Sequence, residues 1–194
     1  MPHLQVIVGT TRPGRFSQKV AAWVVDHVAA RDDVSSELID LRDYPLPFFD
    51  QLPPAYTLRD YPTEAAATFG AKIDQGDGYI VLTGEYNHGY PAVLKNAIDH
   101  SFVEWRRKPV SFVGWGNVGG ARAIEQLRGV VVELEMAPLR HAVHILPELM
   151  VPAMQAPEPF GTGLFSVLDP KLTTLVDDLL WWTTTLATGR ALDA

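Results

Sequence analysis

The segment Leu4-Gln5-Val6-Ile7-Val8-Gly9-Thr10-Thr11-Arg12-Pro13-Gly14-Arg15-Phe16-Ser17-Gln18 decides the fold class of this chain. It opens with an apolar run, residues 4–8, that is typical of a buried strand. Glycine, hydroxyl and arginine residues follow, and a helical pattern then starts at Ser17, which we expect to cap that helix. A strand, a short polar loop and a helix in this order predict the first unit of a parallel α/β sheet.

The same alternation continues along the rest of the chain. Short apolar runs predict strands at residues 4–8, 36–41, 78–83, 109–113 and 142–146. Helical patterns predict helices at residues 17–30, 63–75, 91–103, 120–135 and 170–185. Such alternation indicates right-handed crossovers and helices on both faces of one sheet. We therefore expect an α/β three-layer sandwich with a five-stranded parallel sheet in the flavodoxin-like order 2-1-3-4-5.

Two long stretches carry neither a strand nor a helix pattern. Residues 43–62 contain five prolines and several aromatic residues, which predicts a long surface loop. Residues 147–160 are predicted to be irregular as well. Neither stretch has the composition of a disordered linker, so we expect residues 1–194 to form a single domain.

Composition narrows the class of function. The net charge is −7, which argues against a nucleic-acid partner because phosphate backbones need a clustered basic surface. The chain has no cysteine, so it can form neither a disulfide nor a thiolate metal site. No apolar run is long enough for a signal peptide or a membrane span, and we expect a cytoplasmic protein that does not enter a membrane.

Ligands of such sheets bind outside the carboxyl ends of the strands, where the strand order reverses. The loop after the first strand offers hydroxyls, arginines and glycines at a helix N-terminus, which favours a phosphate group. A plain turn with solvated arginines is the competing interpretation. The loop is not a P-loop, because the Gly-Lys-Ser/Thr ending is missing.

The loop after the third strand, Gly84-Glu85-Tyr86-Asn87-His88-Gly89-Tyr90-Pro91, combines polar groups with aromatic rings. This mixture suits a flat heterocycle, although a tight turn with a left-handed Asn87 also explains it.

The loop after the fourth strand contains a G-x-G-x-x-G pattern at residues 114–119. We reject a dinucleotide fingerprint, since that motif belongs in the first strand–helix unit with an acid on the next strand. Glycines that let the backbone approach a planar ligand are the simpler interpretation.

Three segments together resemble one family. They are Thr10-Thr11-Arg12-Pro13-Gly14-Arg15, then Glu85-Tyr86-Asn87-His88-Gly89-Tyr90-Pro91-Ala92-Val93-Leu94-Lys95-Asn96-Ala97-Ile98-Asp99, then Gly119-Gly120-Ala121-Arg122. They resemble the NADPH-dependent FMN reductase family, which includes azo, quinone and chromate reductases on a flavodoxin-like fold. The resemblance extends from about residue 4 to residue 146. The family commonly has serine in place of Thr10 and proline in place of Gly84.

The resemblance implies a set of cofactor-binding residues. The FMN phosphate would be held by Thr10, Arg12, Ser17 and Gln18, and the isoalloxazine would lie beside Glu85, Tyr86, Asn87 and His88. The glycines Gly116, Gly119 and Gly120 would close the pyrimidine side. Apart from the resemblance, Arg15 is a candidate contact for a nucleotide phosphate. The resemblance also implies a homodimer or homotetramer.

The resemblance further implies an oxidoreductase that passes hydride from NADPH or NADH through FMN to a small-molecule acceptor such as a flavin or a quinone. This chemistry needs no protein acid or base, so we predict no catalytic side chain. Two alternatives stay open: a non-enzymatic electron carrier like flavodoxin, and a flavin-free module that binds a nucleotide. Arg12 and Arg15 argue against the carrier, because a flavodoxin would place mostly hydroxyls there.

Four further features receive structural interpretations. His141 and His144 point to opposite faces of a strand, so we predict no metal site. Lys95 and Asp99 are spaced for an ion pair on a helix surface. Trp181 and Trp182 are predicted to pack in the core or an interface. The apolar residues between 130 and 136 either face a dimer partner or pack against their own sheet.

Overall fold

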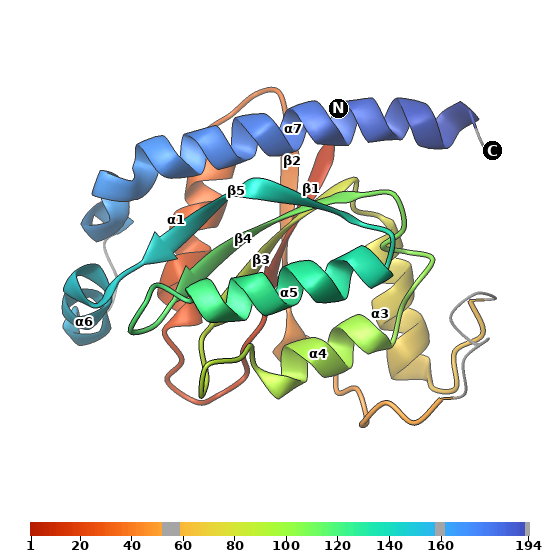
Figure 1. Cartoon of the computed structure of the whole chain (residues 1–194), viewed down its shortest axis with the longest axis horizontal. Helices are drawn as coiled ribbons and strands as arrows, with labels where there is room; N and C mark the ends of the chain where they lie inside the picture. The colour runs from red at the N-terminus through yellow and green to blue at the C-terminus, as the bar shows by residue number, and fades with distance from the viewer. Residues whose placement is uncertain (52–58, 158–161, 193–194) are drawn as a thin grey trace.

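The computed structural model describes residues 1–51, 59–157 and 162–192. Its centre is a five-stranded parallel sheet in the order β2-β1-β3-β4-β5 (Figure 1). The strands are β1 (His3–Val8), β2 (Ser35–Asp40), β3 (Gly78–Gly84), β4 (Pro109–Trp115) and β5 (Ala137–Ile145). The predicted flavodoxin-like order 2-1-3-4-5 is confirmed.

The register of the central strands places their carboxyl ends together. Val8 at the end of β1 pairs with Leu82 of β3, and Gly84 at the end of β3 pairs with Trp115 at the end of β4. Every residue of β3 and β4 is buried, as expected for parallel strands covered on both faces. The loops that follow β1, β3 and β4 therefore leave the sheet at one edge.

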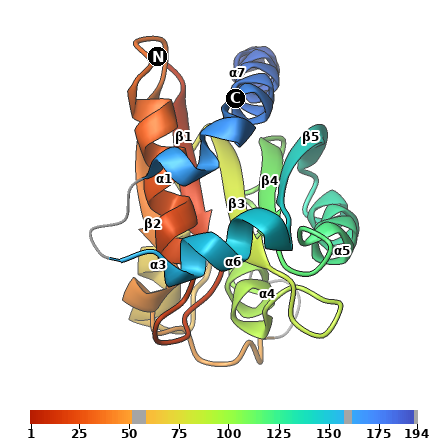
Figure 2. The same ribbon diagram turned by 90° about the vertical axis from the view of Figure 1, so that its left-hand side faces the viewer.

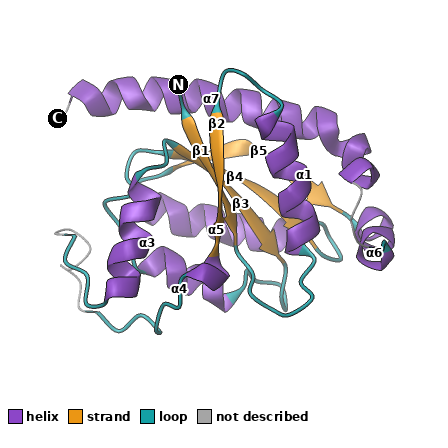
Figure 3. Ribbon diagram, turned by 180° about the vertical axis from the view of Figure 1, so that it is seen from behind, coloured by secondary structure: helices purple, strands orange, loops and turns teal. Residues whose placement is uncertain are grey.

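Helices cover both faces of the sheet, as predicted. They are α1 (Ser17–Ala29), α3 (Glu64–Asp74), α4 (Ala92–Asp99), α5 (Ala121–Glu133), α6 (Pro147–Gln155) and α7 (Asp169–Leu192), with short 3-10 turns η1 (Leu41–Asp43) and η2 (Thr162–Leu168). The helices α1 and α7 share one core with β1, β3, β4 and β5, and α3, α4 and α5 share the other. Figure 3 shows α1 on the near side of the sheet and α5 on the far side.

Residues 147–155 correct the prediction of an irregular stretch, because they form the helix α6. Pro147 suits the first position of a helix, where its missing N–H costs nothing. Pro152 lies inside the helix, where proline is unfavourable, so the local sequence does not favour a helix here. Ala153 is fully buried and anchors the helix. In Figure 2, α6 lies in front of the carboxyl edge of the sheet.

The structure also tests the predictions for an ion pair on α4, for the apolar residues of α5 and for the long loop after β2. The Lys95–Asp99 ion pair is present, with 2.6 Å between Nζ and Oδ2. Val131 is buried against its own sheet together with Leu134 and Met136, whereas Val132 stays 59% exposed. The predicted loop is irregular at residues 44–51, and residues 52–58 lie outside the described part of the chain.

Other boundaries differ from the prediction. The helix expected at 91–103 ends at Asp99, the strand expected at 142–146 begins at Ala137, and the last helix extends to Leu192. In that helix Trp182 packs against the core, while Trp181 is 61% exposed. Within the described residues, no helix combines the length and apolarity that crossing a bilayer requires.

A buried lysine lies at the amino ends of the strands, opposite the three loops. The Lys108 ammonium donates to the Asp74 carbonyl at 3.0 Å and to the Tyr79 hydroxyl at 3.2 Å. Burial disfavours its charge and lowers the pKa of Lys108 to about 8, although the nearby Asp74 partly opposes the shift. The folded state therefore releases this proton at a lower pH than the unfolded chain does.

This shift predicts a pH dependence of stability. Above about pH 8 the native Lys108 loses its proton while the unfolded lysine keeps it up to about pH 10.4, so stability rises with pH in this window. Between pH 7.5 and 9.5 we expect the free energy of unfolding of the wild type to gain about 1–2 kcal/mol relative to that of Lys108→Met. Urea unfolding at a series of pH values measures it. Parallel pH profiles for the two proteins would contradict the prediction.

Candidate active site

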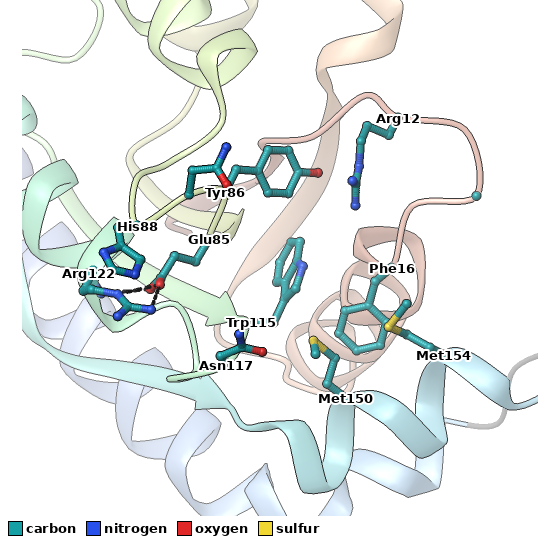
Figure 4. A pocket seen from close by; sticks show the side chains of 13 residues that line it. Arg12, Phe16, Glu85, Tyr86, His88, Trp115, Asn117, Arg122, Met150 and Met154 are labelled. Atoms are coloured by element: carbon teal, nitrogen blue, oxygen red, sulfur yellow. Dashed lines mark hydrogen bonds and ion pairs between the residues drawn. The ribbon is translucent and has the colours of Figure 1, made fainter.

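A cavity of about 700 Å³ opens at the carboxyl edge of the sheet, where the three loops meet (Figure 4). Its lining includes six of the predicted site residues: Arg12, Glu85, Tyr86, Asn87, His88 and Gly116. It also includes residues that were not predicted: Gly14, Phe16, Trp115, Asn117, Arg122, Met150 and Met154. The predicted residues Thr10, Arg15, Ser17, Gln18, Gly119 and Gly120 are not part of the lining.

Ser17 does not cap the first helix, in contrast to the prediction. Phe16 is the residue that precedes α1, and no side chain caps the helix there. The Ser17 hydroxyl is buried and accepts a hydrogen bond from the Thr10 hydroxyl at 2.7 Å. These two hydroxyls therefore tie the start of the first loop to its end. Gln18 is exposed on the first turn of α1.

Arg15 does not line the cavity, and its side chain instead binds the backbone of the first loop. Its guanidinium is 2% exposed and forms two hydrogen bonds with the Asp40 carboxylate and one with the Thr10 carbonyl. Burial opposes the charge of Asp40, but the hydrogen bonds from Arg15 and from the Arg42 N–H outweigh it and hold the pKa of Asp40 below its usual value. The geometry thus places Arg15 outside the cavity lining, in contact with the scaffold of the first loop.

Arg42 in η1, directly after β2, is a second support that the sequence did not reveal. Its side chain donates to the carbonyls of Thr11, at 3.0 Å, and Arg12. Arg12 itself is exposed, and its guanidinium lies 4.6 Å from the centre of the Tyr86 ring. The first loop is therefore held in place by Arg15 and Arg42, while Arg12 stays available at the cavity (Figure 4).

The backbone of the first loop offers free donors. Within the described part of the chain, the N–H groups of Thr11, Arg12, Gly14, Arg15 and Phe16 donate to no protein acceptor. The first turn of α1 carries no acidic residue either. Unpaired N–H groups beside an uncapped helix N-terminus form a site for an anion.

The third loop is a tight turn, as one of its two interpretations predicts, and it also lines the cavity. Tyr86 and Gly89 exchange backbone hydrogen bonds of 2.8 and 3.0 Å. Asn87 and His88 between them have positive φ values of 50° and 69°, as expected for a left-handed turn. The turn holds the Tyr86 ring and the polar side chains of Asn87 and His88 at the cavity.

Glu85 is the buried acid of the site. Its side chain is 4% exposed and forms an ion pair with Arg122, whose Nε donates to Glu85 Oε1 at 2.6 Å. The Arg122 backbone N–H donates to the other oxygen at 3.2 Å, so the carboxylate also neutralises the N-terminus of α5. Arg122 is the last residue of the quoted segment Gly119-Gly120-Ala121-Arg122, and that position is the signal by which its role could have been found.

The glycines of the fourth loop differ in their surroundings: one lines the cavity and two pack against neighbouring backbone. Gly116 lines the cavity, and its φ of 143° suits glycine alone. A Cβ on Gly119 would lie 2.7 Å from the His144 Cβ, and one on Gly120 would lie 2.8 Å from the Trp115 nitrogen. Both also have positive φ values, so their observed role is to let the loop fold back on β4 and β5.

Apolar residues form the remaining side of the cavity. Phe16 and Trp115 meet edge to face, with 5.8 Å between their ring centres. A Cβ on Gly84 would lie 2.9 Å from Trp115 Nε1, which explains a glycine where the related family commonly has proline. Met150 and Met154 come from α6, and the prediction missed them because it missed the helix.

No metal-binding group was found among the described residues, since nowhere do three histidine or acidic side chains gather suitably. His144 instead has Nδ1 3.0 Å from the Gly119 carbonyl oxygen.

Comparisons with known proteins agree with this geometry. A family model described as NADPH-dependent FMN reductase matches residues 2–148. An NAD(P)H-dependent FMN reductase of Schizosaccharomyces pombe is 37% identical over 70% of this chain and 68% of its own length. A 2-hydroxy-1,4-benzoquinone reductase of Burkholderia sp. is 33% identical over 69% of this chain and 72% of its own length.

Solved structures show the same fold. A flavoenzyme NAD(P)H:(acceptor) oxidoreductase from Paracoccus denitrificans superposes with a TM-score of 0.71, covering 95% of this chain and 98% of its own, at 22% identity. The match to the family model covers well over half of the sequence. This chain belongs to the NADPH-dependent FMN reductase family.

Proposed function

We propose that the chain is an NAD(P)H-dependent oxidoreductase that binds FMN in the cavity and reduces small molecules of the flavin or quinone class. The observation that carries the proposal is the convergence of free backbone donors, Arg12 and a lined cavity at the carboxyl edge of the sheet. Family membership and the names of the FMN and quinone reductase relatives support it.

The first loop fits the phosphate end of FMN. A phosphate dianion needs several donors and positive charge, and the unpaired N–H groups before α1 supply both, together with the helix dipole. Arg12 would add a charged, forked donor. Thr10 and Ser17 would support the phosphate-binding loop, because their hydroxyls hydrogen-bond to each other. Gln18 would contact the phosphate from the first turn of α1.

The third and fourth loops fit the ring end. The isoalloxazine is flat, with a polar pyrimidine edge, and the cavity offers Tyr86 as an aromatic partner and Asn87, His88 and Asn117 as polar ones. Gly116 would allow the backbone to approach the pyrimidine. In our proposal Gly119 and Gly120 keep that backbone in place without direct contact.

When bound, FMN supplies the redox chemistry by taking a hydride from NADPH or NADH and delivering it to the acceptor. The side chains of this protein bind and orient the reactants. Glu85 and Arg122 form an ion pair, so the ring end has a fixed pair of opposite charges, and the proton that completes the reduction of a quinone would come from solvent.

We also propose that residues 1–194 act as one domain in the cytoplasm, where NAD(P)H is available, and that the chain forms a homodimer or homotetramer. Self-association is what the resemblance to the FMN reductase family implies. The acidic charge supports the absence of a nucleic-acid partner.

The first prediction for this function concerns cofactor binding. Purified protein incubated with FMN should keep visible flavin absorbance after desalting, and Arg12→Met should weaken FMN binding about 10- to 100-fold, the effect of one lost charged hydrogen bond. Fluorescence titration measures the dissociation constant. Arg140→Met is the matched control, since Arg140 is an exposed arginine of β5 outside the cavity. No flavin bands after reconstitution would refute the proposal and favour a flavin-free nucleotide module.

The second prediction separates an enzyme from an electron carrier. The FMN-loaded protein should oxidise NADPH or NADH steadily in the presence of a quinone, and reciprocal plots at several quinone concentrations should give parallel lines, because donor and acceptor use the same flavin in turn. A yellow protein without turnover, which cycles only with an added reductase, would establish the carrier.

A further inference from the structure

Two methionines of α6 form an apolar surface of the cavity. Met150 and Met154 are four residues apart, so they lie on one face of the helix, and both line the cavity beside Phe16 (Figure 4). Met154 remains 56% exposed. We call Met150 and Met154 the methionine pair.

The helix that carries the methionine pair is held firmly against α1. The Lys19 ammonium donates to the carbonyls of Ala153 at 2.9 Å and Ala156 at 2.8 Å, at the C-terminal end of α6. A cation there also interacts favourably with the helix dipole. Ala153 between the two methionines is fully buried. The pair is therefore presented by a fixed element.

The methionine pair lies outside the segment that the family model matches. The family model ends at residue 148, whereas the free donors, Arg12, Glu85 and Gly116 all fall within residues 2–148. The groups that suit a common cofactor are thus in the common segment. The pair lies beyond the stretch that the family model matches, in a part of the chain where a difference in acceptor preference can arise.

The apolar character of the methionine side chains indicates which kind of ligand the pair would contact. Thioether side chains are apolar, polarisable and adaptable, and their sulfur atoms make favourable contacts with aromatic rings. They cannot solvate a charged group. We propose that the methionine pair contacts the uncharged ring of a planar aromatic acceptor of the quinone class and so determines acceptor specificity. This inference rests on the proposed function.

The test compares polar and apolar replacements in the FMN-loaded protein. Met150→Gln/Met154→Gln should raise the KM for 1,4-naphthoquinone, and its dissociation constant measured by calorimetry without NADPH, about 10-fold. The KM for ferricyanide, a small anion without a ring, and the dissociation constant of FMN should stay within about twofold. Met150→Leu/Met154→Leu should behave like the wild type for naphthoquinone. Val151→Gln, on an exposed part of α6 outside the cavity lining, is the matched control.

Each other outcome counts against the inference. Weakened FMN binding in the glutamine variant would mean that the pair holds the cofactor, and equal losses with ferricyanide would mean a general defect. Unchanged naphthoquinone binding would exclude contact with the acceptor. The single Met154→Gln change, at an exposed position, repeats the test if the double variant fails to fold. If the wild type binds no FMN or oxidises no NADPH, the proposed function fails first, and the inference with it.

Discussion

The common direction of all five strands is the constraint on which the rest of this structure depends. Because the strands are parallel, every loop that follows a strand leaves from the same edge of the sheet. The register aligns the last residues of β3 and β4 and brings the end of β1 beside Leu82, near the end of β3, so three loops that are far apart in the sequence meet there. The buried central strands fix this meeting point rigidly. The cavity results from the topology, and the side chains of the loops give it its chemistry.

Much of the charge around the cavity serves to hold the loops. Arg15 and Arg42 bind Asp40 and backbone carbonyls, which keeps the first loop open with its N–H groups unpaired. Glu85 and Arg122 connect the third loop to α5 in a similar way. A loop arginine is thus available to a ligand only when it forms no ion pair with an acid of the scaffold. In the first loop Arg12 satisfies this condition among the described residues, whereas Arg15 is bound to Asp40.

The helix α6 adds something that the sheet does not provide. It brings an apolar face to a cavity whose other sides are largely polar or aromatic, and its position is set by contacts with α1. The opposite end of the sheet shows the contrasting use of a buried charge: Lys108 is enclosed by Asp74 and Tyr79, far from the loops, and acts on stability.

The sequence by itself determined where the strands, most helices and the three loops lie and which residues stand at the loop tips, because these features depend on local patterns. The strand order 2-1-3-4-5 was expected from the general rule for doubly wound sheets, and the strand pairing confirms it. Arg12, Glu85, Tyr86, Asn87, His88 and Gly116 could therefore be found before the structure was known. Only the tertiary structure decided that Arg15 faces Asp40, that Ser17 binds Thr10, and that Arg122 and α6 complete the cavity. These outcomes depend on partners 7 to 37 residues apart, and on how helices pack in three dimensions, which no local pattern encodes.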